Sequence, residues 1–350
     1  MNDITVVGMG YVGMCAALGL SNDGGKVHCV GSVDPSGRAD DTRSTALFPA
    51  SIALLKSLDV WDLVVNACRP LAGIRIVDES GSLLRAPEIT FRAAEAGLDA
   101  LAMNVPNHTL HHALATRILD RIPVERRHSH MLKDVKLAPR GVELRLSNDQ
   151  SITSQVVIAA DGRGSTLRSA AGISTRKWSY NQVAIACSFS HTEPHNDIST
   201  EFHRAAGPLT TVPGSSTEEL QTSHLVWIER PDIAKDMMSQ TDEAFRQLLE
   251  TALQGVLGGI TNIGKRGAFP IHGQTANAYA AQGVFLVGEA AHVIPPIGAQ
   301  GMNLGFRDVE GVRAALSYEE TITGSVAPIQ DFYNKHRQND VFLRPPPWIF

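Results

Sequence analysis

The feature that most constrains this chain is a short apolar strand followed at once by a glycine-rich turn and an apolar helix. Ile4 to Val7 forms the predicted strand, and the predicted helix continues to about Leu20 after the turn Gly8-Met9-Gly10-Tyr11-Val12-Gly13. Between a strand and a helix, glycines at this spacing permit a tight turn, close approach of a pyrophosphate and close helix–strand packing. The chain therefore begins with a predicted Rossmann-like unit; the alternative is a βα turn that binds no dinucleotide.

Composition limits the class of protein. The chain has 350 residues, of which 43% are hydrophobic and 19% charged, which is typical of a globular protein with a sizeable core. A net charge of -5 argues against a nucleic-acid partner. The four cysteines show no CxxC spacing, and no apolar run is long enough to cross a bilayer. We expect a soluble cytoplasmic protein without a metal, and peripheral contact at the inner face of a membrane stays open.

The second predicted strand, Lys26 to Val30, ends in an unusual way. In dinucleotide-binding units an acidic residue near this strand end holds the adenosine ribose. Here Gly31-Ser32 occupies that place, and Asp34 lies slightly beyond it. Either Ser32 or Asp34 substitutes for the acid, or other groups hold the ribose.

Arg43 stands among small polar residues ahead of a predicted amphipathic helix, Ser51 to Leu58. A guanidinium pairs with phosphate oxygens through two parallel hydrogen bonds. Arg43 is therefore a candidate clamp for a phosphate or a flavin, with an exposed loop arginine as the alternative.

A later strand, Ser154 to Ala160, delivers a carboxylate and glycines into a turn before another helix. The segment Asp161-Gly162-Arg163-Gly164 has the form of a ligand-binding crevice at the carboxyl edge of a sheet, and Arg168 follows it. The alternative is that Asp161 is only a helix cap.

Residues 284–312 repeat this arrangement near the end of the chain. The apolar run Val284 to Val287 ends at Gly288-Glu289, passes Pro295-Pro296 and reopens as a helix after Gly298. A helix N-terminus presents unpaired N–H groups that favour an anion or an electron-rich ring edge. The alternative is an ordinary strand-to-helix connection rigidified by its prolines.

A helix is also predicted from Asn107 to Ile122, with Asn107 as its N-cap. His108, His111 and His112 lie near its start, where their spacing resembles that of metal ligands. Because no glutamate partner or second cluster accompanies them, we interpret them as surface histidines.

The middle of the chain predicts a second, mostly antiparallel sheet that forms a wall of the substrate pocket. Its expected strands are 74–77, 82–91, 182–189, 199–202, 207–212 and 223–229. A helix over 241–256 and a short strand over 265–269, stopped by Pro270, follow. The last predicted helix covers 329–340, after which Pro345-Pro346-Pro347 cannot continue it.

Together the three strand-end motifs resemble the fingerprints of the single-component flavin aromatic hydroxylases, the group A flavoprotein monooxygenases of the p-hydroxybenzoate hydroxylase fold. Segments 41–47, 58–62 and 288–305 resemble the ubiquinone-biosynthesis hydroxylases within that group. The implied fold is α/β: a GxGxxG-type FAD-binding Rossmann-like domain interleaved with a mostly antiparallel β-sheet substrate domain. The expected FAD-binding domain comprises 1–73, 100–176 and 273–340, and the expected substrate domain comprises 74–99 and 177–272. Residues 341–350 look like a truncated or irregular C-terminus.

Carried over position by position, the resemblance implies an FAD-binding set. Its members are Gly8, Gly10, Gly13, Arg43, Asp161, Gly288 and Glu289. Pro296 is expected near the reactive flavin edge, and Gly301, Met302 and Asn303 at the pyrimidine end of the ring. To the predicted cofactor-binding residues we add Ser32, Asn107, Gly162 and Arg168. No catalytic base is assigned; His292 is a candidate by position only, and a packing role is the favoured interpretation.

The resemblance also implies the chemistry. NAD(P)H reduces FAD, O2 adds to give a flavin hydroperoxide, and an electron-rich ring takes up the distal oxygen. We expect the substrate to be a polyprenylated phenol or quinone precursor in ubiquinone biosynthesis, with other proteins of that pathway as partners. The alternatives are a non-catalytic or uncoupled FAD-binding subunit and an NAD-dependent nucleotide-sugar dehydrogenase.

This chain departs from the family's pattern at three places. Glu289 stands where an aspartate is commoner, the second strand lacks its acidic residue, and the chain ends soon after the last predicted helix. The carboxylate at 289 is retained, so we expect FAD binding to be retained with it.

Overall fold

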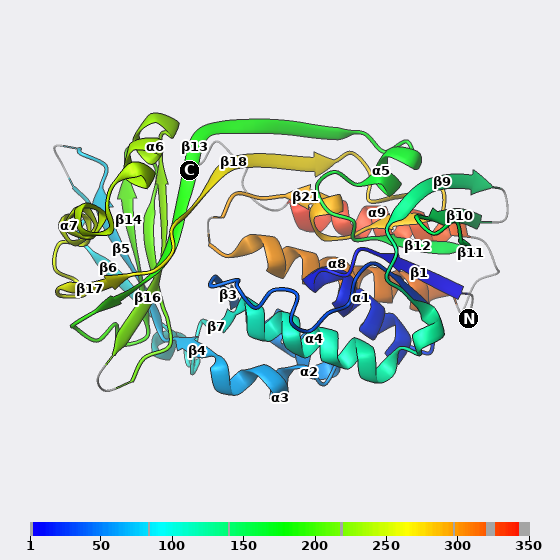
Figure 1. Ribbon diagram of the computed structural model, residues 1–350, viewed down its shortest axis with the longest axis horizontal. Coiled ribbons are helices and arrows are strands. Elements are labelled where there is room, and N and C mark those ends of the chain that lie inside the picture. Colours follow the sequence, from blue (N-terminus) through cyan, green and yellow to red (C-terminus); the bar gives the residue numbers. More distant parts are fainter. Residues whose placement is uncertain are drawn as a thin grey trace.

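The computed structural model describes residues 3–82, 85–138, 141–217, 220–296, 298–319 and 326–342 (Figure 1). Its first elements are those the glycine motif predicts: β1 spans Asp3–Val7 and α1 spans Tyr11–Asn22. Gly8 has a φ of 98°, and a Cβ there would lie 2.2 Å from the Ala160 carbonyl oxygen. A Cβ at Gly13 would lie 1.8 Å from the Gly8 oxygen. Both positions therefore require glycine, one for its backbone angle and both for space.

A largely parallel sheet forms the first half of the molecule, in the order β19-β20-β12-β1-β2-β8. Its register places Val7 opposite Ala159, and Ala159 opposite Leu286. The strands that carry the three sequence motifs are therefore direct neighbours. Besides β1 they are β2 (Lys26–Val30), β8 (Arg127–His128), β12 (Val156–Ala159), β19 (Ala280–Ala281) and β20 (Val284–Leu286).

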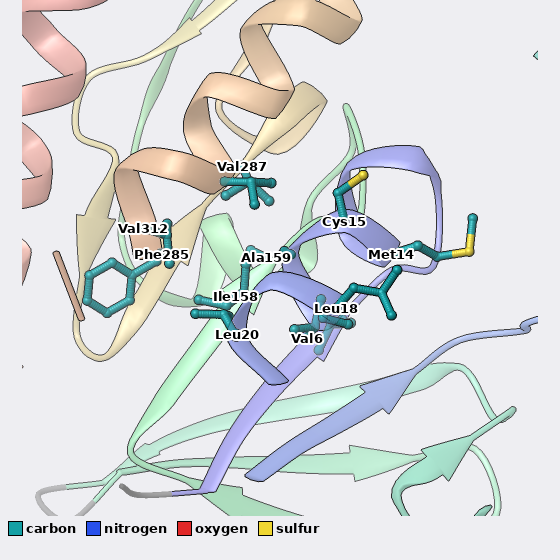
Figure 2. Close-up of a cluster of buried hydrophobic side chains, with 14 of the residues drawn as sticks. Val6, Met14, Cys15, Leu18, Leu20, Ile158, Ala159, Phe285, Val287 and Val312 are labelled. Carbon is teal, nitrogen blue, oxygen red and sulfur yellow. The ribbon is translucent and has the colours of Figure 1, made fainter. Parts of the chain in front are cut away.

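Helices pack along this sheet and close its core. Figure 1 shows α1, α4 and α8 side by side along the strands, and α9 packs against α8. Apolar side chains of β1, α1, β12, β20 and α8 converge in one cluster (Figure 2). The long helices are α4 (Asn107–Arg121), α8 (Gln300–Glu319) and α9 (Val326–Phe342). Shorter ones are α2 (Pro49–Ser57), α3 (Trp61–Val64), α5 (Thr166–Ala170), η1 (Val65–Ala67), η2 (Ala93–Ala96), η3 (Val124–Arg126) and η4 (Gly288–Ala290).

Two smaller sheets flank this half, in the orders β3-β7-β4 and β11-β10-β9. Their strands are β3 (Ser44–Leu47), β4 (Arg69–Leu71), β7 (Ala102–Pro106), β9 (Leu132–Ala138), β10 (Gly141–Leu146) and β11 (Ser151–Ser154). Among the described residues, no helix combines the length and the apolar character needed to cross a bilayer.

The second half is the mostly antiparallel sheet that the sequence predicts, in the order β21-β18-β13-β16-β15-β14-β5-β6, with β17 paired to β13. The pair β14–β5 is parallel. One face packs against α6 (Pro231–Ser239) and α7 (Asp242–Leu253). The strands are β5 (Gly73–Glu79), β6 (Ile89–Arg92), β13 (Thr175–His191), β14 (Ile198–Arg204), β15 (Leu209–Pro213), β16 (Gln221–Glu229), β17 (Ile260–Ile263), β18 (Gly267–Ala276) and β21 (His292–Val293).

The long strands β13 and β18 run between the two halves in Figure 1. Elements of the two halves also alternate along the chain, so neither half is a separate stretch of sequence. The α/β class with an interleaved antiparallel sheet is thus confirmed. The residue boundaries between the two predicted domains stay a prediction.

Four local predictions are wrong. Pro270 does not stop a strand but lies inside β18, because it sits where the pairing with β13 shifts register between Ser179 and Val183, a place where a missing N–H is tolerated. The strand expected over 82–91 is confined to Ile89–Arg92 among the described residues, with 83–84 lying outside them.

The other two errors concern α4. Asn107 is its first helical residue rather than its cap, which is Pro106. His111 is buried, with its ring 5.9 Å from that of Tyr11, because tertiary packing covers this side of the helix. His108 and His112 are exposed as expected. Within the described ranges, no group of three or more His, Cys, Asp or Glu side chains could hold a metal.

We expect Phe285→Ala to lower the free energy of unfolding by about 3–5 kcal/mol, the usual cost of emptying a phenylalanine-sized space in a core. Phe285 is fully buried, and its ring centroid lies 5.7 Å from that of Tyr333. Urea unfolding of the apoprotein measures the change. Phe91→Ala, at a side chain that is 52% exposed, is the control and should cost about 0.5 kcal/mol or less. Equal effects of the two variants would contradict the core assignment.

Candidate active site

Three strand ends meet at one edge of the parallel sheet. Gly8 directly follows β1, whereas Asp161 and Gly288 stand two positions after the last residues of β12 and β20, and these strands are neighbours in the sheet. Ligands of open α/β sheets bind outside the carboxyl ends of the strands. The structure therefore brings the three predicted motifs together at the expected edge.

Gly10 caps α1 at this edge and leaves room for a ligand. It makes no side-chain cap hydrogen bond, and α1 carries no acidic residue in its first turn. A Cβ built at Gly10 meets no atom within 4 Å, in contrast with Gly8 and Gly13. The first N–H groups of a helix lack intrahelical partners and carry a partial positive charge. The start of α1 thus fits a phosphate held close to the backbone.

Arg43 lies near this helix start and is held in place by Asp41. Its Nε and Nη2 donate to the two Asp41 oxygens at 2.8 Å each, while 51% of the Arg43 side chain stays exposed. The hydrogen bond to Asp41 raises the pKa of Arg43, and the carboxylate of Glu289 contributes in the same direction. Arg38 stacks on Tyr11, with its guanidinium carbon 5.1 Å from the ring centroid. Two guanidinium groups therefore surround the start of α1.

Asp161 uses one carboxylate oxygen at a helix start and leaves the other oxygen unpaired. One carboxylate oxygen caps α5 by accepting from the Leu167 N–H at 3.2 Å. The other oxygen, Oδ1, is buried and has no hydrogen-bond partner in the described part of the chain. Gly162 beside it has open space where a Cβ would stand. A buried acceptor without a donor costs free energy unless a ligand supplies one, so this oxygen fits a ligand hydroxyl.

Arg168 acts inside the protein. It is 5% exposed, and it donates to the Ala290 carbonyl at 2.8 Å and to the Arg163 carbonyl at 3.0 Å. It therefore ties the segment after β12 to the turn after β20. On that turn, the Glu289 side chain is 60% exposed and lies 4.0 Å from the Arg163 Nε, which leaves its carboxylate accessible to a ligand.

Asn303 fastens the first turn of α8 to another part of the chain. Its Oδ1 accepts from the Phe48 N–H at 3.0 Å and the Ser51 hydroxyl at 2.6 Å, and its Nδ2 donates to the Ala46 carbonyl at 2.8 Å. Any contact of this residue with a flavin is therefore left to its backbone. Gly301 in the same turn has open space, Met302 is partly buried against the core, and Pro296 is exposed.

Asn107 and Ser32, the other predicted cofactor residues, differ in how they are used. Asn107 Oδ1 accepts from the Thr45 hydroxyl at 2.8 Å. Ser32 is exposed just after β2. Asp34 accepts from the Ser36 N–H at 2.9 Å and the Ser36 hydroxyl at 2.7 Å. Of the two proposed substitutes for the ribose-binding acid, Asp34 already accepts hydrogen bonds from Ser36. Ser32 is therefore the one whose side chain is more available to a ligand.

A buried network of charged side chains supports the turn at Gly288 from inside the protein. Asp308 Oδ2 accepts from the Gly288 N–H at 2.8 Å and from His292 Nε2 at 2.6 Å. Arg337 of α9 lies against the other oxygen, at 2.7 Å, and both side chains are at most 1% exposed. His292 is 3% exposed, so its imidazole is occupied in packing and hydrogen bonding rather than presented to a substrate.

Sequence reasoning missed Asp308 and Arg337. A signal existed, because each places a charge among the apolar positions of a predicted helix: Asp308 lies between Phe306 and Val309, and Arg337 lies one turn after Tyr333. A charge on a buried helix face requires a partner. Which partner it has depends on the packing of α8 against α9.

Comparison with known proteins agrees with this geometry. The family model described as "FAD binding domain" matches residues 1–339. This chain belongs to that family. Ubiquinone hydroxylase UbiL of Rhodospirillum rubrum is 32% identical, with 88% of this chain and 70% of the relative covered. The 3-demethoxyubiquinol 3-hydroxylase of Escherichia coli is 29% identical, with 97% and 86% covered.

Solved structures show the same fold. PqsL of Pseudomonas aeruginosa, solved in complex with 2-aminobenzoylacetate, has a TM-score of 0.78 at 20% identity, with 96% of this chain and 91% of that chain covered. The tetrameric form of 2-methyl-3-hydroxypyridine-5-carboxylic acid oxygenase has a TM-score of 0.71 at 17% identity, with 97% and 86% covered. The p-hydroxybenzoate hydroxylase-like fold is confirmed.

The protein is an FAD-dependent monooxygenase that uses NAD(P)H as its reductant, as its family does. The open Gly10, the free Asp161 oxygen and the accessible Glu289 fit FAD. The nucleotide-sugar dehydrogenase alternative is not retained, because the family match covers the motifs which that alternative leaves unexplained.

Exchanging single glycines separates cofactor binding from folding. Gly10→Ala places a methyl group in space that is open in the apoprotein, so we expect the free energy of unfolding of the apoprotein to change by less than about 1 kcal/mol. The FAD Kd should rise about tenfold or more, because the methyl group keeps the phosphate from the backbone.

Gly13→Ala is the matched control. Its methyl group would clash with the Gly8 carbonyl, so both stability and FAD affinity should fall, stability by about 1–3 kcal/mol. Fluorescence titration with FAD and urea unfolding give the two quantities. An unchanged FAD Kd in Gly10→Ala would contradict the phosphate assignment.

Asp308→Asn and Arg337→Met should each lower the free energy of unfolding by about 3–5 kcal/mol, because each leaves a buried charge without its full partner. The double variant should cost clearly less than the sum of the two single changes. Urea unfolding of the four proteins measures the coupling. Strict additivity would show that the two side chains do not act as a pair.

Proposed function

We propose that this monooxygenase hydroxylates the aromatic ring of a polyprenylated phenol or quinone precursor in ubiquinone biosynthesis. The observation that carries the proposal is the 32% identity to a ubiquinone hydroxylase over 88% of the chain. The second relative, 29% identical, carries an ubiquinol hydroxylase name. Hydroxylation of a phenol ring by a flavoprotein uses FAD, NAD(P)H and O2, and the family match shows the FAD-binding domain that this route requires.

We propose that the start of α1 and Arg43 hold the FAD pyrophosphate. Gly8 and Gly13 shape that turn, and Gly10 leaves space in front of the first N–H groups of the helix. Because Nε and Nη2 of Arg43 both donate to Asp41, the Nη1 group of this exposed guanidinium is the one proposed to donate to a phosphate oxygen. Ser32, at the end of β2, is the proposed contact to the adenosine ribose.

The remaining flavin contacts are proposed for the other two strand ends. Asp161 and Glu289 offer carboxylate oxygens to hydroxyl groups of the cofactor. Gly162 leaves open space beside Asp161, and Gly288 has a φ of 59° directly before Glu289. The pyrimidine end of the ring is proposed to lie at the start of α8, beside Gly301 and Met302. Pro296 precedes α8 by four residues and is proposed to lie near the reactive edge of the ring. Arg168, Asn107 and Asn303 then support these segments through their internal hydrogen bonds.

FAD, once reduced, supplies the activation of O2 and the transfer of one oxygen atom to the ring. The contribution of the chain is to bind, to orient and to keep the site dry. The partial positive charge at the α8 N-terminus would stabilise negative charge on a flavin ring bound there. None of these tasks requires a protein nucleophile.

The proposed substrate also determines where the protein works. A polyprenyl chain keeps its phenol in the bilayer, so the enzyme must reach its substrate at a membrane surface. We therefore propose peripheral contact at the inner face of the membrane, and contact with other quinone-biosynthesis proteins that hand over the same substrate.

Turnover with defined phenols tests the proposal. The FAD-loaded protein is supplied with NADPH, O2 and a series of phenols with and without a prenyl chain, and products are identified by mass spectrometry. We expect one added oxygen atom in the ring of the prenylated phenols, with ¹⁸O label arriving from O2. Hydroxylation of hydrophilic phenols alone would overturn the ubiquinone assignment but not the flavin chemistry. NADPH oxidation that yields only hydrogen peroxide would instead identify an uncoupled subunit.

A further inference from the structure

The antiparallel sheet has two different faces, and β16 shows how its side chains divide between them. Leu225 and Trp227 are buried in the cluster that includes Phe245 of α7. Because successive side chains of a strand point to opposite faces, His224 and Val226 lie on the other face. Val226 accordingly packs against the separate cluster of Ala184, Ile228 and Ile271.

This second face is turned toward the FAD-binding half. Phe269 pairs with Ala184 in the register and so shares its face, and the guanidinium carbon of Arg43 lies 5.8 Å from the Phe269 ring centroid. At the end of β15, the Pro213 carbonyl accepts from Asn104 Nδ2 of β7 at 2.8 Å. Figure 1 agrees, with α7 on the outer side of the sheet and the ends of β3 and α8 across from its inner side.

His224 stands in the middle of this inner face. Its register partners are Val212 on β15 and Ser188 on β13. Within the described part of the chain, no hydrogen bond or ion pair involves its imidazole. The imidazoles of His191 and His195, in contrast, have both ring nitrogens engaged by neighbouring groups. His224 is thus a polar group that the fold itself does not use.

The protonation state of His224 limits what it can do. Burial lowers the pKa of His224 to about 4. The imidazole is therefore neutral near pH 7, with one nitrogen that accepts a hydrogen bond and one that donates. A base this weak does not remove a phenol proton, but it accepts a hydrogen bond from the hydroxyl, and that bond increases electron donation from oxygen into the ring.

We propose that His224 binds the phenolic hydroxyl of the aromatic substrate and orients the ring on the inner face of the sheet. The proposal rests on the proposed function, since it presumes a phenol substrate. Val212 and Val226 flank the imidazole on this face and offer apolar contact to the ring. The step involves hydrogen bonding only, so no proton or electron leaves the pair.

Binding of a phenol and of its methyl ether tests the assignment without turnover. The holoenzyme is titrated with 2-prenylphenol, and then with the corresponding methyl ether, while the flavin absorbance reports binding. In His224→Leu we expect the Kd for the phenol to rise about tenfold, as one lost hydrogen bond to a neutral group predicts. The Kd for the ether should change less than about twofold, because the ether has no hydrogen to donate.

Two further variants control for folding and for position. His224→Gln keeps an acceptor and should restore part of the phenol affinity. His203→Leu removes another imidazole from the same face, but one that is 54% exposed and lies 3.5 Å from Glu201; it should leave both Kd values unchanged. FAD content and the Tm of each variant show whether it is folded.

The outcomes separate the two proposals. If the wild type binds the phenol and His224→Leu binds it equally well, the His224 assignment is wrong and the proposed function stands. An equal loss of affinity for phenol and ether also overturns the assignment, because it would show that the substitution changes the packing of the inner face rather than one hydrogen bond to the hydroxyl. If the wild type binds neither ligand, the proposed substrate class itself fails.

Discussion

The candidate site depends on the carboxylate of Asp308, which is fully buried. Asp308 holds the Gly288 N–H and His292 with one oxygen and faces Arg337 with the other, and all three side chains are at most 3% exposed. Burying two charges is expensive, and only close pairing with further hydrogen bonds offsets the cost. The network therefore joins α8, α9 and the end of β20 into one unit. If Asp308 lost its partners, the turn that carries Glu289 would lose its support.

Much of the fold was predictable because its determinants are local. Glycines at 8, 10 and 13 follow a strand, and the same short pattern of strand, turn and helix recurs at Asp161 and Gly288. Parallel strands with right-handed crossovers place all such turns at one edge of a sheet. Each motif was predicted locally as a strand-end turn, and the family resemblance was what joined the three motifs into one expected site. The mostly antiparallel sheet was predictable for a similar reason, since short alternating runs separated by turns indicate it.

The errors and omissions concern residues whose role is set by distant partners. The side-chain partner of Asn303 was not predicted: its Oδ1 accepts from Ser51, 252 residues earlier in the chain. Pro270 stays in a strand because of a register shift opposite Ser179 to Val183. His111 is buried only because Tyr11 and the segment near Gly37 pack over it. Such contacts arise from tertiary packing, which a local pattern does not record.

The same distinction explains why no catalytic side chain was visible in the sequence. His292 sits in the most specific motif of the chain, but the fold uses its imidazole as a donor to Asp308. His224 sits in no motif, and what marks it is its unused imidazole on the inner face of the sheet. A flavoprotein whose cofactor carries out the bond-making needs few reactive protein groups near the ring. Under the proposed function, selectivity for the substrate depends on the inner face of the antiparallel sheet, where single polar residues among apolar neighbours are the informative ones.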